Sequence, residues 1–410
     1  DKGILFSDYD DRFSFEEIKI SMIMKIIQEK SIENVFLQID RILEKYELNP
    51  NETIISLSGG YALNCPTNFD IMDRYKFKEM MCAPCVNDGG LSIGMGLYFF
   101  KKFMDSFIYK FEGAFYGYDD RKNFADTVDI YRDYISDVSE NVKKISDDIL
   151  KSPILWLDGN AEIGPRALGH RSIIADARNK DHKDLLNIYK QREWWRPVAP
   201  IVLAEDIGDW FEDSYLSPYM LHNFTVKAEK AEIIPAVLHF DLTARVQSLK
   251  REDNESLYNV IREIKEKTNV PIVCNTSMND KGEPIINTLA EAINFALRKK
   301  IGIIYAYGHR IVLKNHDLYT EMKWLKRNDW PFVNHRRDRE SVMKKYNPFR
   351  LPYQDFLVYM FNPQLRKMDI TKEKDYKKVE SMIKKMKLLG SNLIIFEEWG
   401  KKIGEGDIEA

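Results

Sequence analysis

The chain has 410 residues, of which 44% are hydrophobic and 30% charged, a composition typical of a globular protein with two or three domains. Its 22 Phe, 21 Tyr and seven Trp exclude disorder as the dominant state, because so many aromatic side chains cannot all stay in water. No window approaches 18 uncharged apolar residues, so we expect no membrane span. The net charge of −3 provides no general basic field for nucleic acid. Four cysteines are typical of free thiols, which predicts a cytoplasmic location.

Apolar periodicity predicts a regular alternation of elements along the chain. A strand, a glycine turn and a helix follow one another twice before residue 100, and this repetition predicts an α/β fold. Glycine turns between a strand and a helix are the usual places for phosphate or ligand groups. Predicted helices cover 14–46, 91–97, 121–150, 181–191, 255–267, 289–298 and 374–388. Predicted strands cover 53–57, 79–83, 154–157, 198–203, 221–226, 270–274 and 393–396.

The most informative segment is GPRALGHRS, residues 164–172. Arg166 and Arg171 stand five positions apart among glycines, directly after a predicted strand. A guanidinium presents a fixed fork of donors that suits phosphate or carboxylate oxygens, and glycines let the backbone approach such an anion closely. A loop whose arginines pair with structural carboxylates is an equally good interpretation of this segment alone.

Three further polar segments favour an anion site over a structural loop. They are Lys190–Pro197, His239–Gln247 and Asn275–Asn279, each beside a predicted strand. Several polar turns that bear Arg, Asn and Ser at strand ends predict one convergent anion-binding pocket. No Ser or His here has the arrangement of a nucleophile triad, so we expect a charged substrate to be positioned rather than attacked by the protein.

Taken together, these segments resemble the O-carbamoyltransferases of the NodU/TobZ type, which make carbamoyl esters on antibiotics and signalling sugars. The blocks GPRALG-x-RS, K-x-RE-x-x-RP-x-AP, H-x-D-x-TAR-x-Q and NTS-x-N-x-x-GEP occur here in that family's order. Upstream, residues 58–64 resemble the family's GG-x-ALN turn and residues 88–90 its D-x-G turn. The resemblance covers roughly residues 14–313.

The resemblance implies an organisation into three parts. Residues 1–112 would be the C-terminal half of a Kae1-like domain, of the actin/Hsp70-like ATPase superfamily. Residues 113–318 would be a YrdC-like mixed α/β domain, and 319–410 a basic, aromatic extension of unknown role. The YrdC-like domain would form carbamoyl adenylate from carbamoyl phosphate and ATP with Mg²⁺. The carbamoyl group would then pass to a hydroxyl of a small-molecule acceptor at the Kae1-like domain, assisted by iron or a similar divalent metal.

The resemblance also implies site residues, position by position. Catalytic roles at the carbamoyl adenylate would belong to Arg166, Arg171 and Arg245, and substrate binding to Lys190, Arg196, Asn275 and Ser277. Nucleotide binding would belong to Gly59, Gly60 and Asn64, and metal binding to Asp88. Independently of the family, departure of phosphate and adenylation need preorganised cations more than a protein nucleophile.

Some features depart from the family pattern. The first of the seven histidines is His170, so the family's metal-binding histidine motif is absent, through cleavage or truncation, a separate subunit or a degenerate domain. In the YrdC-like part, Asn160–Ala161 replaces an Arg-containing pair and Leu242 replaces a glycine.

Two competing functions remain: a threonylcarbamoyl-type enzyme acting on tRNA, and a subunit that completes a split carbamoyltransferase without transferring alone. The tail 319–410 has 20 basic and 14 acidic residues, a modest excess that favours a surface or a subunit contact over nucleic acid.

Overall fold

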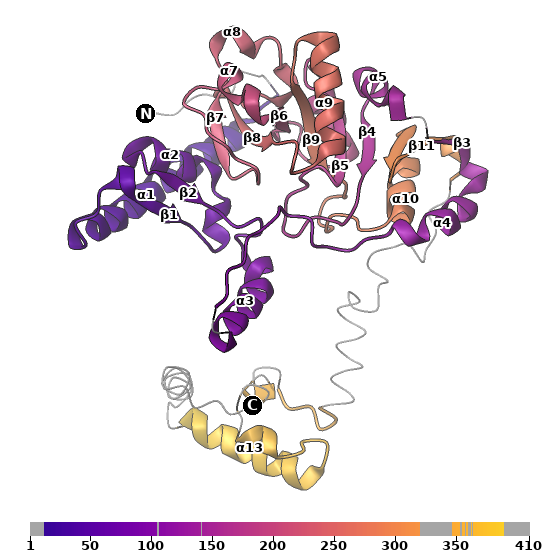
Figure 1. Cartoon of the computed structure of the whole chain (residues 1–410). Coiled ribbons are helices and arrows are strands. Elements are labelled where there is room, and N and C mark those ends of the chain that lie inside the picture. Colours follow the sequence, from indigo (N-terminus) through magenta and orange to yellow (C-terminus); the bar gives the residue numbers. More distant parts are fainter. Residues whose placement is uncertain are drawn as a thin grey trace. The chain divides into compact units, whose positions relative to one another are not determined.

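The structure, a computed structural model, describes residues 12–104, 106–140, 142–319, 347–352 and 355–388, the last with gaps at 357, 360, 361 and 363. The chain forms two compact units, residues 1–321 and 322–410 (Figure 1). The described helices are α1 (Phe15–Lys45), α2 (Cys65–Tyr75), α3 (Leu91–Phe103), α4 (Phe124–Ile130), α5 (Ile145–Lys151), α6 (Asp181–Tyr189), α7 (Ile207–Trp210), α8 (Ala228–Ala231), α9 (Glu255–Thr268), α10 (Leu289–Lys299) and α13 (Glu373–Leu388). The described strands are β1 (Ile54–Ser56), β2 (Glu79–Met81), β3 (Ile135–Ser139), β4 (Ile154–Leu157), β5 (Arg171–Asp176), β6 (Ala199–Leu203), β7 (His222–Thr225), β8 (Thr243–Leu249), β9 (Ile272–Ser277), β10 (Ile303–Ala306) and β11 (His309–Leu313).

A nine-stranded mixed sheet organises the first unit, with the strand order β3-β11-β10-β4-β5-β9-β6-β8-β7. Strand β4 runs parallel to β10 and antiparallel to β5. Strand β9 runs antiparallel to both β5 and β6, and β6 runs parallel to β8. The carboxyl ends of β4, β9 and β10 therefore share one edge of the sheet with the amino ends of β5, β6 and β8. The predicted α/β class is confirmed, and this edge collects residues from six strands.

An apolar core joins the sheet to helices α5 and α9. Helices α5 and α9 bury Ile149, Leu257 and Ile261 against the strand residues Trp156 and Val273. Strand β5 is buried along its whole length, which is why its alternation is invisible in the sequence. Helix α9 begins at Asn254, whose side chain accepts a hydrogen bond from the amide of Leu257.

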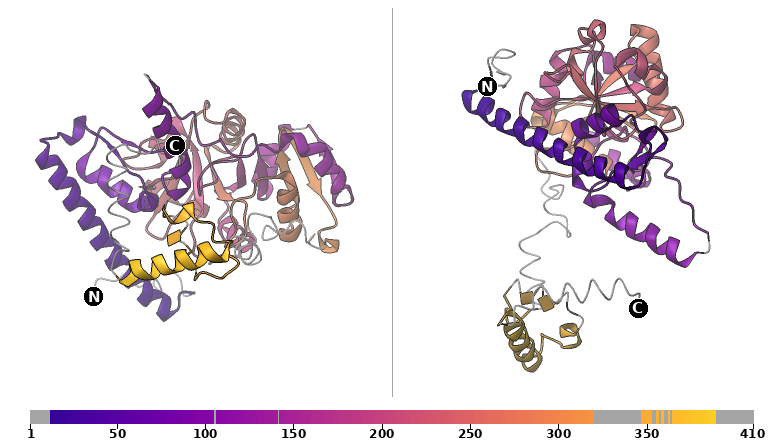
Figure 2. Two further views of the ribbon diagram at one scale, coloured as in Figure 1. Left: turned by 90° about the horizontal axis from the view of Figure 1, so that it is seen from below. Right: turned by 90° about the vertical axis from the view of Figure 1, so that its left-hand side faces the viewer.

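The segment before residue 105 forms a smaller layer of its own. Helix α1 starts with a capping box between Ser14 and Glu17, and β1 pairs in parallel with β2 as a two-stranded sheet. Isolated two-stranded sheets are marginal in water, and here Ile39, Ile71 and Phe77 pack beneath it. Figure 2 shows α3 standing apart from both sheets, and none of its residues is buried.

The second unit has a small core of its own, in which Leu351 and Leu365 pack with Val379 and Ile383 of α13. Helix α13 confirms the helix predicted over 374–388, whereas the strand predicted over 393–396 lies outside the described residues. Within the part of the chain that the structure describes, no helix is both long and apolar enough to cross a membrane.

The other predicted helices and strands are confirmed with shifts of a few residues at their ends, and one region was predicted wrongly. Residues 121–150 are not all helical, because β3 separates α4 from α5. Strands β5, β8, β10 and β11 were not predicted. The last two form a hairpin whose turn, Tyr307 and Gly308, has φ of 52° and 84°, the left-handed geometry that such tight turns need.

Candidate active site

The loop that precedes β5 is folded around one carboxylate. Oε1 of Glu162 accepts hydrogen bonds from the amides of Leu168, His170 and Arg171, at 2.7, 2.8 and 3.1 Å. Gly169 has φ of 110°, and a Cβ there would lie 2.7 Å from a methyl of Leu257, so this position needs glycine. A carboxylate that gathers several amides holds a loop firmly, and this loop presents Arg166 at the shared edge of the sheet.

Arg171 differs from Arg166 although both belong to the same motif. Its side chain is fully buried, and the guanidinium donates to the carbonyl oxygens of five residues at 2.6 to 3.2 Å. These are Tyr118, Asp158, Gly159, His170 and Asn287. A guanidinium has five N–H donors, so no donor is left for a substrate in this arrangement. The geometry gives Arg171 a structural role in place of the catalytic one that the sequence predicted.

Arg166 and Arg245 lie close enough to repel each other, an arrangement that suits an anion site. The Nε atom of each is buried, and neither has a hydrogen-bond partner among the described residues. Burial, followed by repulsion from Arg166, lowers the pKa of Arg245 to about 10. Cys65, at the start of α2, lies within the field of both arginines, which oppose the rise that burial causes in the pKa of its thiol. Two desolvated like charges with unused donors form a site suited to an anion.

Lys190, at the end of α6, adds a third cation. Its Nζ donates to the carbonyl and hydroxyl of Ser277, at 2.6 and 2.9 Å, and to the carbonyl and side-chain oxygens of Asn279, at 3.2 and 2.6 Å. Burial, followed by repulsion from Arg192, lowers the pKa of Lys190 to about 7. Burial and the neighbouring Arg196 lower the pKa of Arg192 to about 10. We call Arg166, Lys190, Arg192 and Arg245 the cation cluster.

Polar side chains of the strands support the cation cluster. Nδ2 of Asn275 donates to the carbonyl of Ala167 at 2.9 Å and to Oε1 of Gln247 at 3.1 Å. Gln247 in turn donates to the carbonyl of Leu168 at 2.7 Å. Oδ1 of Asn275 is buried and has no partner in the described part of the chain. Asn275 therefore holds the Arg166 loop and keeps one acceptor unused.

Arg196 lies outside this arrangement. Its side chain is half exposed and forms an ion pair with Glu193 at 2.8 Å, and Glu193 also binds Lys281 at 2.8 Å. Lys281, and then Arg196, hold the pKa of Glu193 at about 2. The structure thus brings Arg166, Lys190, Arg245, Asn275 and Ser277 together and leaves Arg171 and Arg196 in other surroundings.

The predicted nucleotide and metal residues of the first segment lie in two adjacent turns. The amide of Gly59 donates to the carbonyl of Val86 at 2.7 Å, and a Cβ added at Gly59 or Gly60 would meet no heavy atom within 4 Å. The side chain of Asn64 already has partners close by. It caps α2, and its Nδ2 donates to Oε1 of Gln28 at 2.8 Å. The turns are open to a ligand, and their roles stay predictions.

Asp88 is exposed at the second turn. In the described ranges, no three His, Cys, Asp or Glu side chains lie close enough to hold a metal ion. Because a transition metal typically takes about three protein ligands, Asp88 alone does not fit an iron site.

Comparison with known proteins identifies the domain that carries the cation cluster. Residues 147–314 match a family model described as "Carbamoyltransferase C-terminus". These residues are thus similar to the C-terminal domain of carbamoyltransferases. The resemblance to the NodU-type O-carbamoyltransferases is thereby confirmed.

Curated relatives extend the match beyond that domain. The nodulation protein NolNO of Sinorhizobium fredii is 35% identical over 252 residues, which are 58% of this chain and 37% of that protein. The 3′-hydroxymethylcephem-O-carbamoyltransferase of Streptomyces clavuligerus is 30% identical over 62% of this chain and 47% of that enzyme. A Methanocaldococcus jannaschii protein is 32% identical over 72% of this chain and 57% of its own length. The chain thus spans about half the length of the curated relatives it matches.

Several residues of the site were not predicted from the sequence. Arg192, Gln247 and Asn279 lie within the predicted polar segments but were not predicted as site residues, and Glu162 lies just before the GPRALGHRS segment. Arg192 stands two residues after Lys190, and Asn279 stands two residues after Ser277. This closeness to predicted site residues was a signal for both of them.

The pKa of Lys190 leads to a prediction for stability. In the unfolded chain a lysine keeps its proton up to about pH 10.4, whereas in the folded domain Lys190 loses it near pH 7. Between these values the unfolded state binds more protons, so folding stability rises with pH. We expect the free energy of unfolding, relative to a Lys190→Met variant, to rise by on the order of 1 kcal/mol per unit between pH 7 and 9. Urea titrations of both proteins at several pH values measure it. A constant difference would contradict it.

Leu242, which stands where the family has glycine, adopts φ of 62° in the turn before β8. Its side chain is 48% exposed, so it has little packing to offset this strain. We expect Leu242→Gly to be more stable than Leu242→Ala by about 1 kcal/mol, because only glycine adopts this conformation freely. Thermal unfolding of the two variants tests this, and equal melting temperatures would show that the turn is relaxed.

Proposed function

We propose that the chain supplies the activating part of an ATP-dependent O-carbamoyltransferase. Water would hydrolyse carbamoyl phosphate to carbamate and phosphate, and the carbamate oxygen would then attack the α-phosphorus of ATP, which yields carbamoyl adenylate and releases pyrophosphate. The carbamoyl group would then pass to a hydroxyl of a small-molecule acceptor. The observation that carries this proposal is the pair Arg166 and Arg245, whose buried Nε donors have no partner in the described structure. The relatives named as carbamoyltransferases support it.

The cation cluster can do this chemistry without a nucleophile. Phosphoryl and nucleotidyl transfer depend on positioning and on charges that are fixed before the reaction starts. Arg166 and Arg245 would bind phosphate oxygens in place of the missing partners of their Nε atoms. The three N–H donors of Lys190 are used by Ser277 and Asn279, so its charge would act on the developing negative charge through its field and not through a direct hydrogen bond. Oδ1 of Asn275 is an acceptor suited to the carbamoyl amide N–H₂.

The domain roles follow from the same proposal. The part around the nine-stranded sheet would be the YrdC-like domain, and the part that contains β1, β2 and α3 would belong to a Kae1-like domain. ATP with Mg²⁺ would be bound as a substrate at the cation cluster, and Gly59 and Gly60 would approach a nucleotide in the Kae1-like part.

The activating step has a direct test. The chain should release pyrophosphate from MgATP when carbamoyl phosphate is present, and not when acetyl phosphate replaces it, because only the carbamoyl group offers an amide to Asn275. Coupled detection of pyrophosphate measures this. Release that does not depend on carbamoyl phosphate would reject the proposed function.

The exposed surface of helix α3 favours a contact with a further part of the carbamoyltransferase. Helix α3 exposes Leu91, Met95, Tyr98, Phe99 and Phe103 by 58 to 71%. A large exposed apolar surface marks a binding face. We propose that it is covered by a polypeptide corresponding to the part of the relatives that this chain does not match, which would also bring the histidines that Asp88 lacks.

Mutation of α3 tests this contact. With that polypeptide added, we expect Phe99→Asp or Phe103→Asp to weaken complex formation at least about tenfold, as for a central apolar contact. Ile130→Asp is the matched control, because Ile130 is exposed to 51% on α4. Analytical ultracentrifugation measures the association. Equal affinities of all three variants would exclude α3 as the contact.

A further inference from the structure

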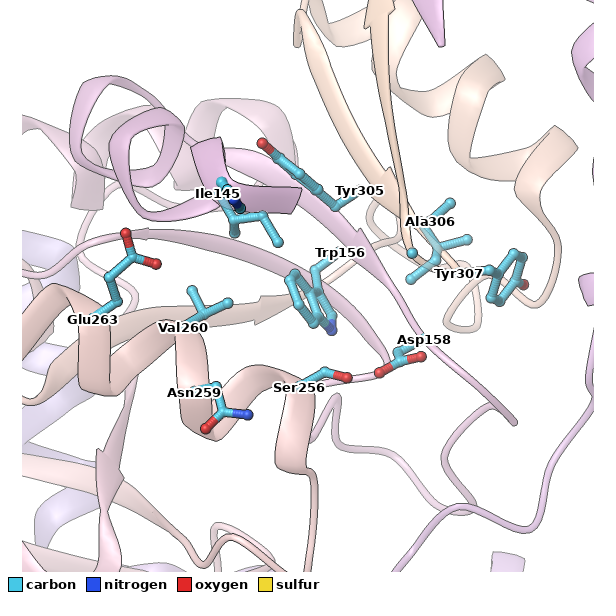
Figure 3. A pocket seen from close by; sticks show the side chains of 13 residues that line it. Ile145, Trp156, Asp158, Ser256, Asn259, Val260, Glu263, Tyr305, Ala306 and Tyr307 are labelled. Carbon is cyan, nitrogen blue, oxygen red and sulfur yellow. The ribbon is translucent and has the colours of Figure 1, made fainter. Parts of the chain in front are cut away.

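A second cavity lies on the same side of the sheet and is not used by the proposed function. It has a volume of about 410 Å³ and opens at the carboxyl end of β4, between α9 and the β10–β11 turn (Figure 3). No member of the cation cluster lines it. The Arg166 loop contacts the helix that lines the cavity, because the carbonyl of Gly169 accepts a hydrogen bond from Asn254 at the start of α9.

The floor of this cavity contains an unused donor. Trp156 is only 5% exposed, and its buried Nε1 has no hydrogen-bond partner among the described residues. Figure 3 shows the indole nitrogen directed between Ser256 and Asp158. Buried polar atoms are nearly always paired, so an unpaired one at a cavity wall points to a missing acceptor.

The polar groups around that donor are complementary to it. Asp158 and Ser256 offer a carboxylate and a hydroxyl, and Asn259 offers a carboxamide whose oxygen also has no partner in the described structure. Lys143 is the cation of the lining, against the carboxylates of Asp158 and Glu263. The cavity therefore suits a ligand that is neutral where it is buried and that carries both donors and acceptors.

We propose that this cavity binds a nucleoside. The edge of a base supplies the acceptor for Trp156 Nε1 together with donors and acceptors for Asn259, while its faces contact apolar walls such as Val260. Asp158 directly follows a strand, the position from which an acidic residue binds the two ribose hydroxyls in nucleotide-binding α/β folds. Trp156 and Tyr305 are 95 to 97% buried, and of the aromatic residues in the lining Tyr307 is the partly exposed one.

The position of the cavity connects it with the Arg166 loop. The carbonyls of Asp158 and Gly159 accept hydrogen bonds from Arg171. These bonds attach the end of the Arg166 loop to the residues that follow β4. The nucleoside could be a free molecule or the nucleoside part of a nucleotide whose phosphates lie elsewhere. Either source uses the same contacts, and the proposal holds whether or not the chain activates carbamate.

Binding of the four common ribonucleosides to the full chain, measured by isothermal titration calorimetry, tests the proposal. At least one should bind, and Trp156→Phe should weaken it about tenfold by removal of the Nε1 donor. Trp210→Phe, which replaces another buried tryptophan, 4% exposed and remote from the lining, should leave the affinity unchanged. The 2′,3′-dideoxy form should bind about tenfold more weakly than the nucleoside, and Asp158→Asn should remove this difference.

Further measurements distinguish the two sources of the nucleoside and define the results that would overturn the proposal. Equal affinity for the nucleoside and its triphosphate would identify a free nucleoside as the ligand. A stronger triphosphate that Trp156→Phe and Arg245→Met each weaken would identify a nucleotide that reaches the cation cluster from this cavity. No binding of any nucleoside, binding that Trp156→Phe leaves unchanged, or binding of methyl glucoside in their place would overturn the proposal. Pyrophosphate release plays no part in this readout, so the proposed function can fail separately.

Discussion

Replacement of Arg245 by methionine should lower carbamoyl-phosphate-dependent pyrophosphate release by about 100-fold or more, the usual cost of removing one preorganised charge-stabilising group. The same change should not reduce stability. Burial and Arg166 both disfavour the charge on Arg245, and its Nε has no partner in the described structure to leave behind. Loss of activity without loss of stability is the signature of a group retained for function at the expense of folding.

Arg196→Met provides the control for this experiment. Arg196 carries the same charge, lies in the same motif as Lys190 and is half exposed beside Glu193. We expect its replacement to change the rate by less than about threefold, because exposed ion pairs contribute little. Steady-state pyrophosphate release and urea unfolding, measured on both variants, separate the two cases. A larger effect at Arg196 than at Arg245 would show that the substrate lies at the rim.

Replacement of Arg171 by methionine should have the opposite pattern, with a stability loss of about 3–5 kcal/mol, as expected when a buried charged partner is removed. Five carbonyl groups would lose the guanidinium donor at once. Those of Tyr118 and His170 keep the amide donors of Ala161 and Asp158, so the cost falls on the carbonyls of Asp158, Gly159 and Asn287, because a buried carbonyl left unpaired is costly. Arg171→Lys should recover part of the loss, since an ammonium has three donors in place of five.

Urea unfolding monitored by circular dichroism measures these differences. If Arg171→Met is as stable as the native protein but inactive, then Arg171 contacts the substrate, as the sequence predicted, and the carbonyl contacts are replaced when substrate binds.

The sequence predicted well which polar residues stand at the ends of strands, but it did not reveal which of their side chains are buried. The α/β class and the edge that gathers the polar turns could be predicted, because glycines and polar clusters after apolar runs mark strand ends. Arg166 and Arg171 could not be told apart, since both stand beside glycines in one motif. The carbonyls that bind Arg171 come from residues as distant as Tyr118 and Asn287, and no local pattern reveals them.

The unpredicted strands have a similar cause. Strand β5 starts at Arg171 itself, where the sequence was interpreted as loop, because a buried charged residue at a strand end is rare. Strand β8 alternates between polar residues, such as Arg245 and Gln247, and small apolar ones such as Ala244, which weakens its apolar signal. In contrast, the β10–β11 turn at Tyr307 and Gly308 carried a glycine signal that could have been recognised.

The repulsion between Arg166 and Arg245 has a thermodynamic consequence. Any small oxyanion that fits between them binds the native chain and not the unfolded one, so it must raise the free energy of unfolding by linkage, about 2.7 kcal/mol at a hundred times its dissociation constant. We therefore expect a higher melting temperature in phosphate than in an amine buffer of the same pH and ionic strength. The increase should grow with phosphate concentration as the site between the two arginines fills.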